Sequence, residues 1–129
     1  MALELRIVTP SALAFSGPAE EVQAPGVDGE FGVLEGHALL LSSLRPGVVT
    51  VHAGAERNRF FVSRGFAEVG PHSVTLIVES CERADTVDKA AAAQTLHEVE
   101  RGLLQAEVDS PEWKELKDAQ ELAAARLEV

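Results

Sequence analysis

Residues 3–8 read LELRIV, a stretch in which apolar and charged side chains alternate. Leu3, Leu5 and Ile7 fall on one side of an extended chain, and the charged positions between them fall on the other. This period of two is typical of a β-strand that has one buried and one solvated face. Because the apolar side of such a strand needs cover, the stretch predicts a second sheet packed against it.

Short segments rich in β-branched residues continue to about residue 80, with turn residues between them. The segments that we expect to form strands are 3–8, 13–16, 21–24, 31–34, 38–41, 48–53, 59–63, 66–69 and 73–79. Ser16-Gly17-Pro18 is one of the expected turns. Many short strands around one apolar layer predict an all-β domain at residues 1–84, either a sandwich or a flattened barrel.

The composition changes after Glu79, where alanine and glutamate become frequent and glycine and proline are absent until Gly102 and Pro111. Such a composition favours helices. Apolar side chains at helical spacing share one face of the first expected helix. They are Ala92, Leu96, Val99, Leu103 and Ala106. Thr86 or Asp85 is expected to cap the start of this helix.

A second helix is expected to begin at Ser110-Pro111, because serine caps free backbone N–H groups and proline fits the first helical position. Its mostly apolar face consists of Trp113, Leu116, Gln120, Ala123 and Leu127. We expect Trp113 to anchor the hairpin beside Leu116, with contact to a partner as the alternative for the tryptophan. The short link between the helices predicts an antiparallel hairpin at residues 85–129.

The composition of the 129 residues is that of a folded protein, with 46% hydrophobic and 25% charged residues. A formal net charge of -10 weighs against nucleic acid as a partner, because nucleic-acid binding depends on Lys and Arg. Cys81 is the only cysteine, which excludes an intrachain disulfide and a metal site built from several thiolates. With no signal-peptide pattern and no apolar run near the roughly 18 residues that span a bilayer, we expect a soluble, cytoplasmic protein.

The stretch GVDGEFGVLEGHA, residues 26–38, is rich in glycine and raises the question of a phosphate-binding loop. Such a loop needs backbone N–H groups at the start of a helix and a lysine nearby. No lysine precedes Lys89, strands are expected on both sides, and Asp28, Glu30 and Glu35 would repel a phosphate. We therefore interpret these glycines as turns and points of close backbone approach.

No combination of side chains in the sequence indicates an active site or a metal site. The histidines are scattered without the spacing of metal ligands, at His37, His52, His72 and His97. Ser63 and Ser80 lack the context of an activated nucleophile, and no sequence neighbour marks Cys81 as reactive. We interpret Cys81 as a buried or half-buried apolar residue at the end of a strand, and predict no catalytic, metal-binding or cofactor-binding residue.

Three stretches carry a resemblance to a known family. They are LRIVTPSALAFSG at residues 5–17, PGVDGEFGVLEGHALLLSSLRPGVVTV at residues 25–51 and RFFVSRGFAEVGPHSVTLIVESCERAD at residues 59–85. In order and spacing they resemble the epsilon subunit of bacterial F-type ATP synthases, and the resemblance extends over the whole chain. It implies an N-terminal flattened β-sandwich, a C-terminal antiparallel two-helix hairpin, no catalytic activity and no cofactor.

The resemblance also implies partners for the chain. A subunit of this family binds the gamma subunit and the c ring, and turns with them as proton flow drives ATP synthesis. It is peripheral to the membrane, on the cytoplasmic face of the bacterial inner membrane. The loop that contains Glu30 and Phe31 is implied to face the polar loops of the c ring, and the region of His37 to lie near gamma. The hairpin is implied to extend among the alpha and beta subunits and to restrain ATP hydrolysis.

Two features of the hairpin bear on this regulatory role. Some family members bind ATP through a pattern like I/L-D-x-x-R-A, and Ala91 stands here at the arginine position, so we expect weak or no ATP binding. Alanine contributes little apolar area, and Gly102 weakens the first helix by about 1 kcal/mol relative to alanine. A hairpin held this weakly is expected to change state easily.

Two alternatives to this rotor subunit with a regulatory hairpin stay open. One keeps the family but makes the hairpin a nucleotide sensor, and the other is a free-standing β-sandwich that binds a small molecule.

Overall fold

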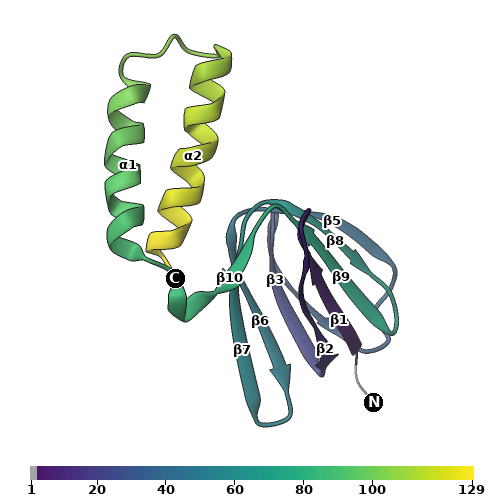
Figure 1. Ribbon diagram of the computed structural model, residues 1–129. Coiled ribbons are helices and arrows are strands. Elements are labelled where there is room, and N and C mark those ends of the chain that lie inside the picture. The colour runs from purple at the N-terminus through teal and green to yellow at the C-terminus, as the bar shows by residue number, and fades with distance from the viewer. Residues whose placement is uncertain (1–2) are drawn as a thin grey trace. The chain divides into compact units, whose positions relative to one another are not determined.

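The computed structural model describes residues 3–129, which form two compact units (Figure 1). The first unit ends at Thr86 and contains the strands, and the second, Val87–Val129, is a pair of helices. The expected fold class, a β-sandwich followed by a two-helix hairpin, is confirmed. The boundary falls after Thr86 because the 3₁₀ helix Ala84–Thr86 packs against the strands.

The strands of the first unit form two layers. In chain order they are β1 (Leu3–Val8), β2 (Leu13–Ala19), β3 (Glu21–Gly26), β4 (Gly29–Leu34), β5 (Leu40–Leu44), β6 (Gly47–Ala53), β7 (Glu56–Val62), β8 (Gly65–Val69), β9 (Ser73–Val78) and β10 (Cys81–Arg83). One layer has the order β10-β7-β6-β3-β4 and the other the order β5-β8-β9-β1-β2. Strands β1 and β9 run parallel, whereas the other neighbours run antiparallel.

A single residue pair, Gly26 with Leu44, joins the two layers between β3 and β5. Strands β2 and β10 stand at the two ends of the strand order, so the domain is a sandwich and not a closed barrel. On that open side Phe15 of β2 packs against Phe60 of β7, with ring centroids 5.0 Å apart. This aromatic contact ties an edge strand of one layer to the other layer.

The core lies between the layers and follows the alternation of each strand. In β1, Leu3, Leu5 and Ile7 are buried while the charged residues between them are exposed, as the sequence predicts. Val22 of β3 and Val33 of β4 belong to the opposite layer and are buried in the same core. Complete burial of such a side chain contributes about 1.5–3 kcal/mol, so the shared core is what holds the layers together.

The hairpin consists of α1 (Lys89–Leu103) and α2 (Pro111–Leu127). Ser110 caps α2 as predicted, and its Oγ accepts a hydrogen bond of 3.1 Å from the backbone N–H of Trp113. The prediction of Thr86 or Asp85 as the cap of α1 is wrong. Asp88 is the cap, because its carboxylate accepts a hydrogen bond of 3.0 Å from the backbone N–H of Ala91.

Two local predictions in the sandwich are also wrong. Ser16-Gly17-Pro18 lies inside β2 and makes no turn, since an edge strand tolerates a proline that lacks the N–H group. Residues 81–83 form a further strand, β10, which pairs with β7. Cys81 therefore begins a strand and does not end one.

Candidate interaction surface

Strand β4 carries Glu30 and Phe31, two of the residues implied by the resemblance. It pairs with β3 alone and forms one edge of its layer. Glu30 is exposed opposite Pro25, whereas Phe31 is half-buried. A Cβ atom on Gly26 would lie 3.0 Å from the Phe31 ring and 2.7 Å from the carbonyl oxygen of Gly29. Glycine at position 26 thus lets the ring of Phe31 pack closely against the backbone of β3.

His37 lies beyond the other end of β4, in the loop that leads to β5. Its Nδ1–H donates a hydrogen bond of 2.7 Å to the carbonyl oxygen of Ala38. The loop is held in place because the N–H of Gly36 donates to the carbonyl oxygen of Pro71, also at 2.7 Å. Glu30 and Phe31 are therefore neighbours at the start of β4, and His37 is half-buried past the end of the same strand.

The outward side of the layer β5-β8-β9-β1-β2, called here the outer face, has an apolar surface that sequence reasoning missed. Phe66 of β8 pairs with Ile77 of β9, Ile77 pairs with Val8 of β1, and Val8 pairs with Leu13 of β2. We call these four residues the apolar row. Phe66 is 54% exposed, Ile77 45% and Leu13 55%. An outward sheet face in contact with water is normally polar, so this row is typical of a surface that a partner covers.

A shallow hollow of about 420 Å³ borders the apolar row on the same layer. The residues that line it are Leu39, Leu40, Leu41, Glu68, Val69, Gly70, Ser73 and Thr75. In cross-strand register, Leu41 of β5 stands beside Glu68 of β8, and Glu68 stands beside Thr75 of β9. Leu39 is 83% exposed and Leu41 70%. The hollow therefore combines exposed leucines with a single carboxylate.

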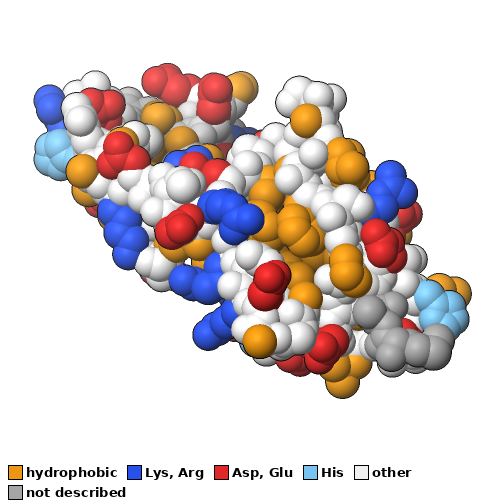
Figure 2. Space-filling view, turned by 60° about the horizontal axis from the view of Figure 1, so that its bottom comes forward, with side chains coloured by type: hydrophobic (Ala, Val, Ile, Leu, Met, Phe, Trp, Pro, Cys, Tyr) orange, Lys and Arg blue, Asp and Glu red, His pale blue; other side chains and the backbone are white. Residues whose placement is uncertain are grey.

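Hydrophobic side chains gather over the β-sandwich on the face that Figure 2 shows, with basic and acidic side chains around them.

One pattern in the sequence could have revealed the apolar row. The segments GFAEV and SVTLIV place apolar residues on both sides of the strand, whereas LELRIV alternates strictly through its first five residues. A strand that is apolar on both sides is typical of burial on both faces.

Trp113 and Leu116 lie on α2 within the hairpin. Trp113 is half-buried, and the Nζ of Lys117 stands 5.7 Å from its ring centroid. A Cβ atom on Gly102 would lie 3.3 Å from one Leu116 methyl and 3.4 Å from the other. The glycine that weakens α1 thus leaves room for the side chain of Leu116 on α2.

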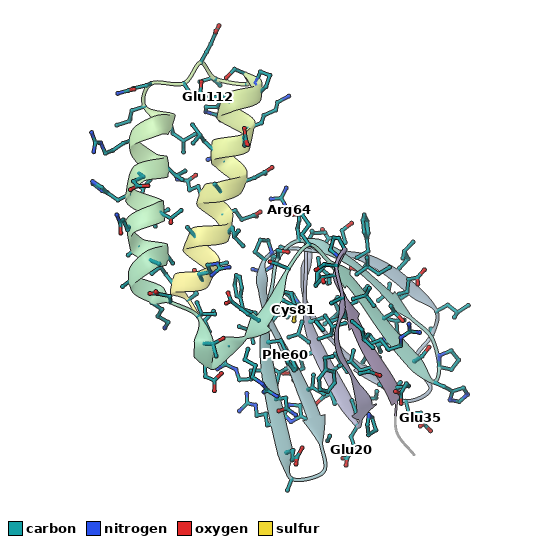
Figure 3. The ribbon with its side chains drawn as sticks, viewed as in Figure 1. Glu20, Glu35, Phe60, Arg64, Cys81 and Glu112 are labelled. Carbon is teal, nitrogen blue, oxygen red and sulfur yellow. The ribbon has the colours of Figure 1, made fainter. Side chains whose placement is uncertain are left out.

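Cys81 lies at the start of β10, half-buried and packed against the core (Figure 3). Burial raises the pKa of its thiol, and the negative charge of Glu82 raises it further. The thiol therefore stays protonated near neutral pH and is a poor nucleophile. Among residues 3–129 no group of His, Cys, Asp and Glu side chains is arranged to hold a metal ion. The helices within that range are too short or too polar to cross a membrane.

Comparison with known proteins identifies the family of this chain. Residues 2–84 match the family model described as ATP synthase, Delta/Epsilon chain, beta-sandwich domain. An ATP synthase epsilon chain from Cyanothece sp. is 37% identical over 129 residues, which is 100% of this chain and 94% of the relative. The chain belongs to the ATP synthase epsilon chain family. The resemblance seen in the sequence is confirmed.

Two solved structures share the fold of this epsilon chain. One is a chain of the Euglena gracilis mitochondrial ATP synthase, solved with OSCP, F1 and c-ring, which has a TM-score of 0.83 and 23% identity and covers 96% of this chain and 78% of its own. The other comes from the central stalk and c-ring of the Tetrahymena thermophila mitochondrial ATP synthase. It has a TM-score of 0.69 and 16% identity, and covers 98% of this chain and 93% of its own. Both matches include the helices as well as the sandwich.

Proposed function

We propose that this epsilon chain is a non-catalytic part of the central stalk of a bacterial F-type ATP synthase. In this role it binds the gamma subunit and the c ring and turns with them, so that proton flow through the c ring is coupled to ATP synthesis by the alpha and beta subunits. The chain would sit at the cytoplasmic face of the inner membrane without entering it. Family membership supports this role, and the exposed apolar row is the observation that carries it.

The outer face is the surface that we assign to the gamma subunit. Permanent interfaces are more apolar than transient ones, because both partners keep the surface away from water throughout. Phe66, Ile77 and Leu13 form such a surface across the layer. His37 belongs to the loop that leads into β5, the strand at one margin of this face. Its place supports the expectation that the region of His37 lies near gamma.

The c ring is assigned to the edge formed by β4. The exposed Glu30 and the exposed tip at Val27 and Asp28 offer a narrow, mainly polar surface. Polar loops of a ring that turns together with the stalk need contacts of this kind, with hydrogen bonds and charge at the rim. Phe31 fixes this edge to β3 through its packing against Gly26.

The hairpin is the part that we propose to restrain ATP hydrolysis, by extending among the alpha and beta subunits. Its support is the small apolar area that it buries: the buried residues of its helices are Ala92, Val99 and Ala123. Two alanines and a valine contribute much less free energy than the leucines of the sandwich core. A partner that prefers another arrangement of the helices can therefore shift the population with modest binding energy.

Capture of the partners by the full-length chain tests the assignment. An affinity-tagged chain should retain gamma and the c ring from detergent-solubilised membranes. The Phe66→Ser variant should retain at least tenfold less gamma, because it puts a hydroxyl in the apolar row. Retention of gamma by the serine variant would contradict the assigned face. Removal of residues 89–129 should raise the ATPase rate of the reconstituted complex, and an unchanged rate would contradict the restraint by the hairpin.

A further inference from the structure

The hollow beside the apolar row has a chemistry that the proposed docking of gamma does not by itself explain. Its walls are the exposed side chains of Leu39 and Leu41, and Glu68 stands between Leu41 and Thr75 in cross-strand register. Ser73 and Thr75 add two hydroxyl groups to the lining. The residues that line the hollow thus offer hydrogen-bond acceptors and apolar walls, and they include no basic side chain.

Glu68 would be costly to cover with an apolar surface alone. In the structure, within residues 3–129, its carboxylate has no hydrogen bond and no ion pair with another side chain, and it is free to accept from a partner. Arg6, the nearest basic residue in the same cross-strand row, stands on β1 with Thr75 between the two. A carboxylate that loses its water without gaining a donor is strongly disfavoured.

We infer that the hollow receives an arginine or lysine side chain of the gamma subunit, whose aliphatic stem lies between the leucines and whose charged end binds Glu68. This inference rests on the proposed docking of gamma on the outer face. Long basic side chains bury their methylene groups against apolar surface and keep the charge at a polar partner, which is the combination that the hollow offers. The continuity of the hollow with the apolar row places this contact within the same interface.

The direct test is Glu68→Gln, which keeps the shape of the side chain and removes its charge. Glu68 is exposed, so the variant should fold, and its thermal melt verifies this. The dissociation constant of the purified full-length chain for the gamma subunit should rise tenfold or more, with a weaker dependence on salt. The matched control is Glu56→Gln, an exposed glutamate at the start of β7 in the other layer, which should leave the constant unchanged. Equal constants for the wild type and Glu68→Gln would overturn the inference.

A charge exchange identifies the partner residue. Glu68→Lys should abolish detectable binding, and each exposed Lys or Arg of gamma is then replaced in turn by Glu. One of these replacements should restore at least a tenth of the original affinity, because it recreates the ion pair with reversed charges. If no replacement restores binding, the hollow does not receive a basic side chain of gamma.

The Phe66→Ser variant separates this inference from the proposed function. If Phe66→Ser weakens the binding of gamma and Glu68→Gln does not, the outer face is the docking surface, but the hollow does not bind a basic side chain of gamma. If the wild-type chain does not bind gamma, the proposed function itself fails.

Discussion

Gly65→Ala tests how closely the strands of the outer face approach one another. Gly65 begins β8 and pairs with Val78 of β9. A Cβ atom at this position would overlap the carbonyl oxygen of Ile77 and lie 2.8 Å from the Cα of Val78. Both atoms belong to the backbone of the neighbouring strand, so rotation of a side chain cannot relieve the contact.

The cost follows from what has to move. Strand β9 must shift away from the start of β8, which weakens the backbone hydrogen bonds there by about 1 kcal/mol each. Crowding in a closely packed region adds a further strain of about 1–3 kcal/mol. We therefore expect Gly65→Ala to lower the free energy of unfolding of the sandwich by roughly 2–4 kcal/mol. For a domain of this size each kcal/mol lowers the melting temperature by about 4–8 °C, so a decrease of at least about 8 °C is expected.

The assay has to follow the sandwich and not the hairpin. The chain has one tryptophan and no tyrosine, and Trp113 lies on α2, so intrinsic fluorescence reports the hairpin. Circular dichroism of the strands and amide hydrogen exchange in β8 and β9 report the sandwich directly. The matched control is Gly32→Ala in the edge strand β4, where the nearest atom to a new Cβ is a carboxylate oxygen of Glu21 at 3.4 Å. This control should melt within a few degrees of the wild type, and a Gly65→Ala protein that melts with it would refute the argument.

Three further predictions concern the hairpin and the cysteine. Asp88→Ala removes the N-cap of α1 and should lower hairpin stability by about 1 kcal/mol in a denaturant titration followed by Trp113 fluorescence, whereas Asp88→Asn should retain most of it. Gly102→Ala gains up to about 1 kcal/mol of helix propensity, and the flexible end of Leu116 has to shift by only a few tenths of an ångström. The same titration should therefore show a net stabilisation. A destabilised hairpin would mean that the leucine cannot move. Burial raises the pKa of the Cys81 thiol, so its contribution to stability is complete at pH 7, below the unfolded pKa, and is lost as the pH rises through the folded pKa. Thermal melts of wild type and Cys81→Ala between pH 7 and pH 10 should converge at the alkaline end, and a constant difference would contradict the shift.

Most elements could be predicted because their signals are local. The alternation in LELRIV depends only on neighbouring residues, and the Ser110-Pro111 start of α2 depends on one turn of helix. Strand β10 could not be predicted, because its segment CER has no periodicity of its own. It is held by distant groups: Ser80 donates its backbone N–H to the Oγ of Ser63 at 2.7 Å, and β7 supplies the paired strand. Such pairing depends on the tertiary structure, which local patterns do not contain.

The candidate surface, too, could be predicted from the sequence only in part. The glycine-rich stretch drew attention to β4, and the structure explains Gly26 by the ring of Phe31. The apolar row was missed because a strand apolar on both sides predicts burial, and the sequence does not say whether the cover comes from this chain or from a partner. The other strands of the sandwich leave Phe66 and Ile77 exposed, so any cover has to come from outside the β-sandwich. Register across β8, β9, β1 and β2, which no local pattern fixes, brings the row together.

The division of the molecule into a well-packed sandwich and a lightly packed hairpin fits two different tasks. The outer face and the edge of β4 lie on different layers, joined by a core in which residues such as Leu5, Val22 and Leu76 are completely buried. Close-packed protein interiors deform little, so a force applied at one surface is transmitted to the other. The hairpin buries few large side chains and can be rearranged at low cost. Gly65→Ala should therefore impair the binding of both gamma and the c ring, whereas removal of residues 89–129 should leave both contacts intact and alter only the rate of hydrolysis.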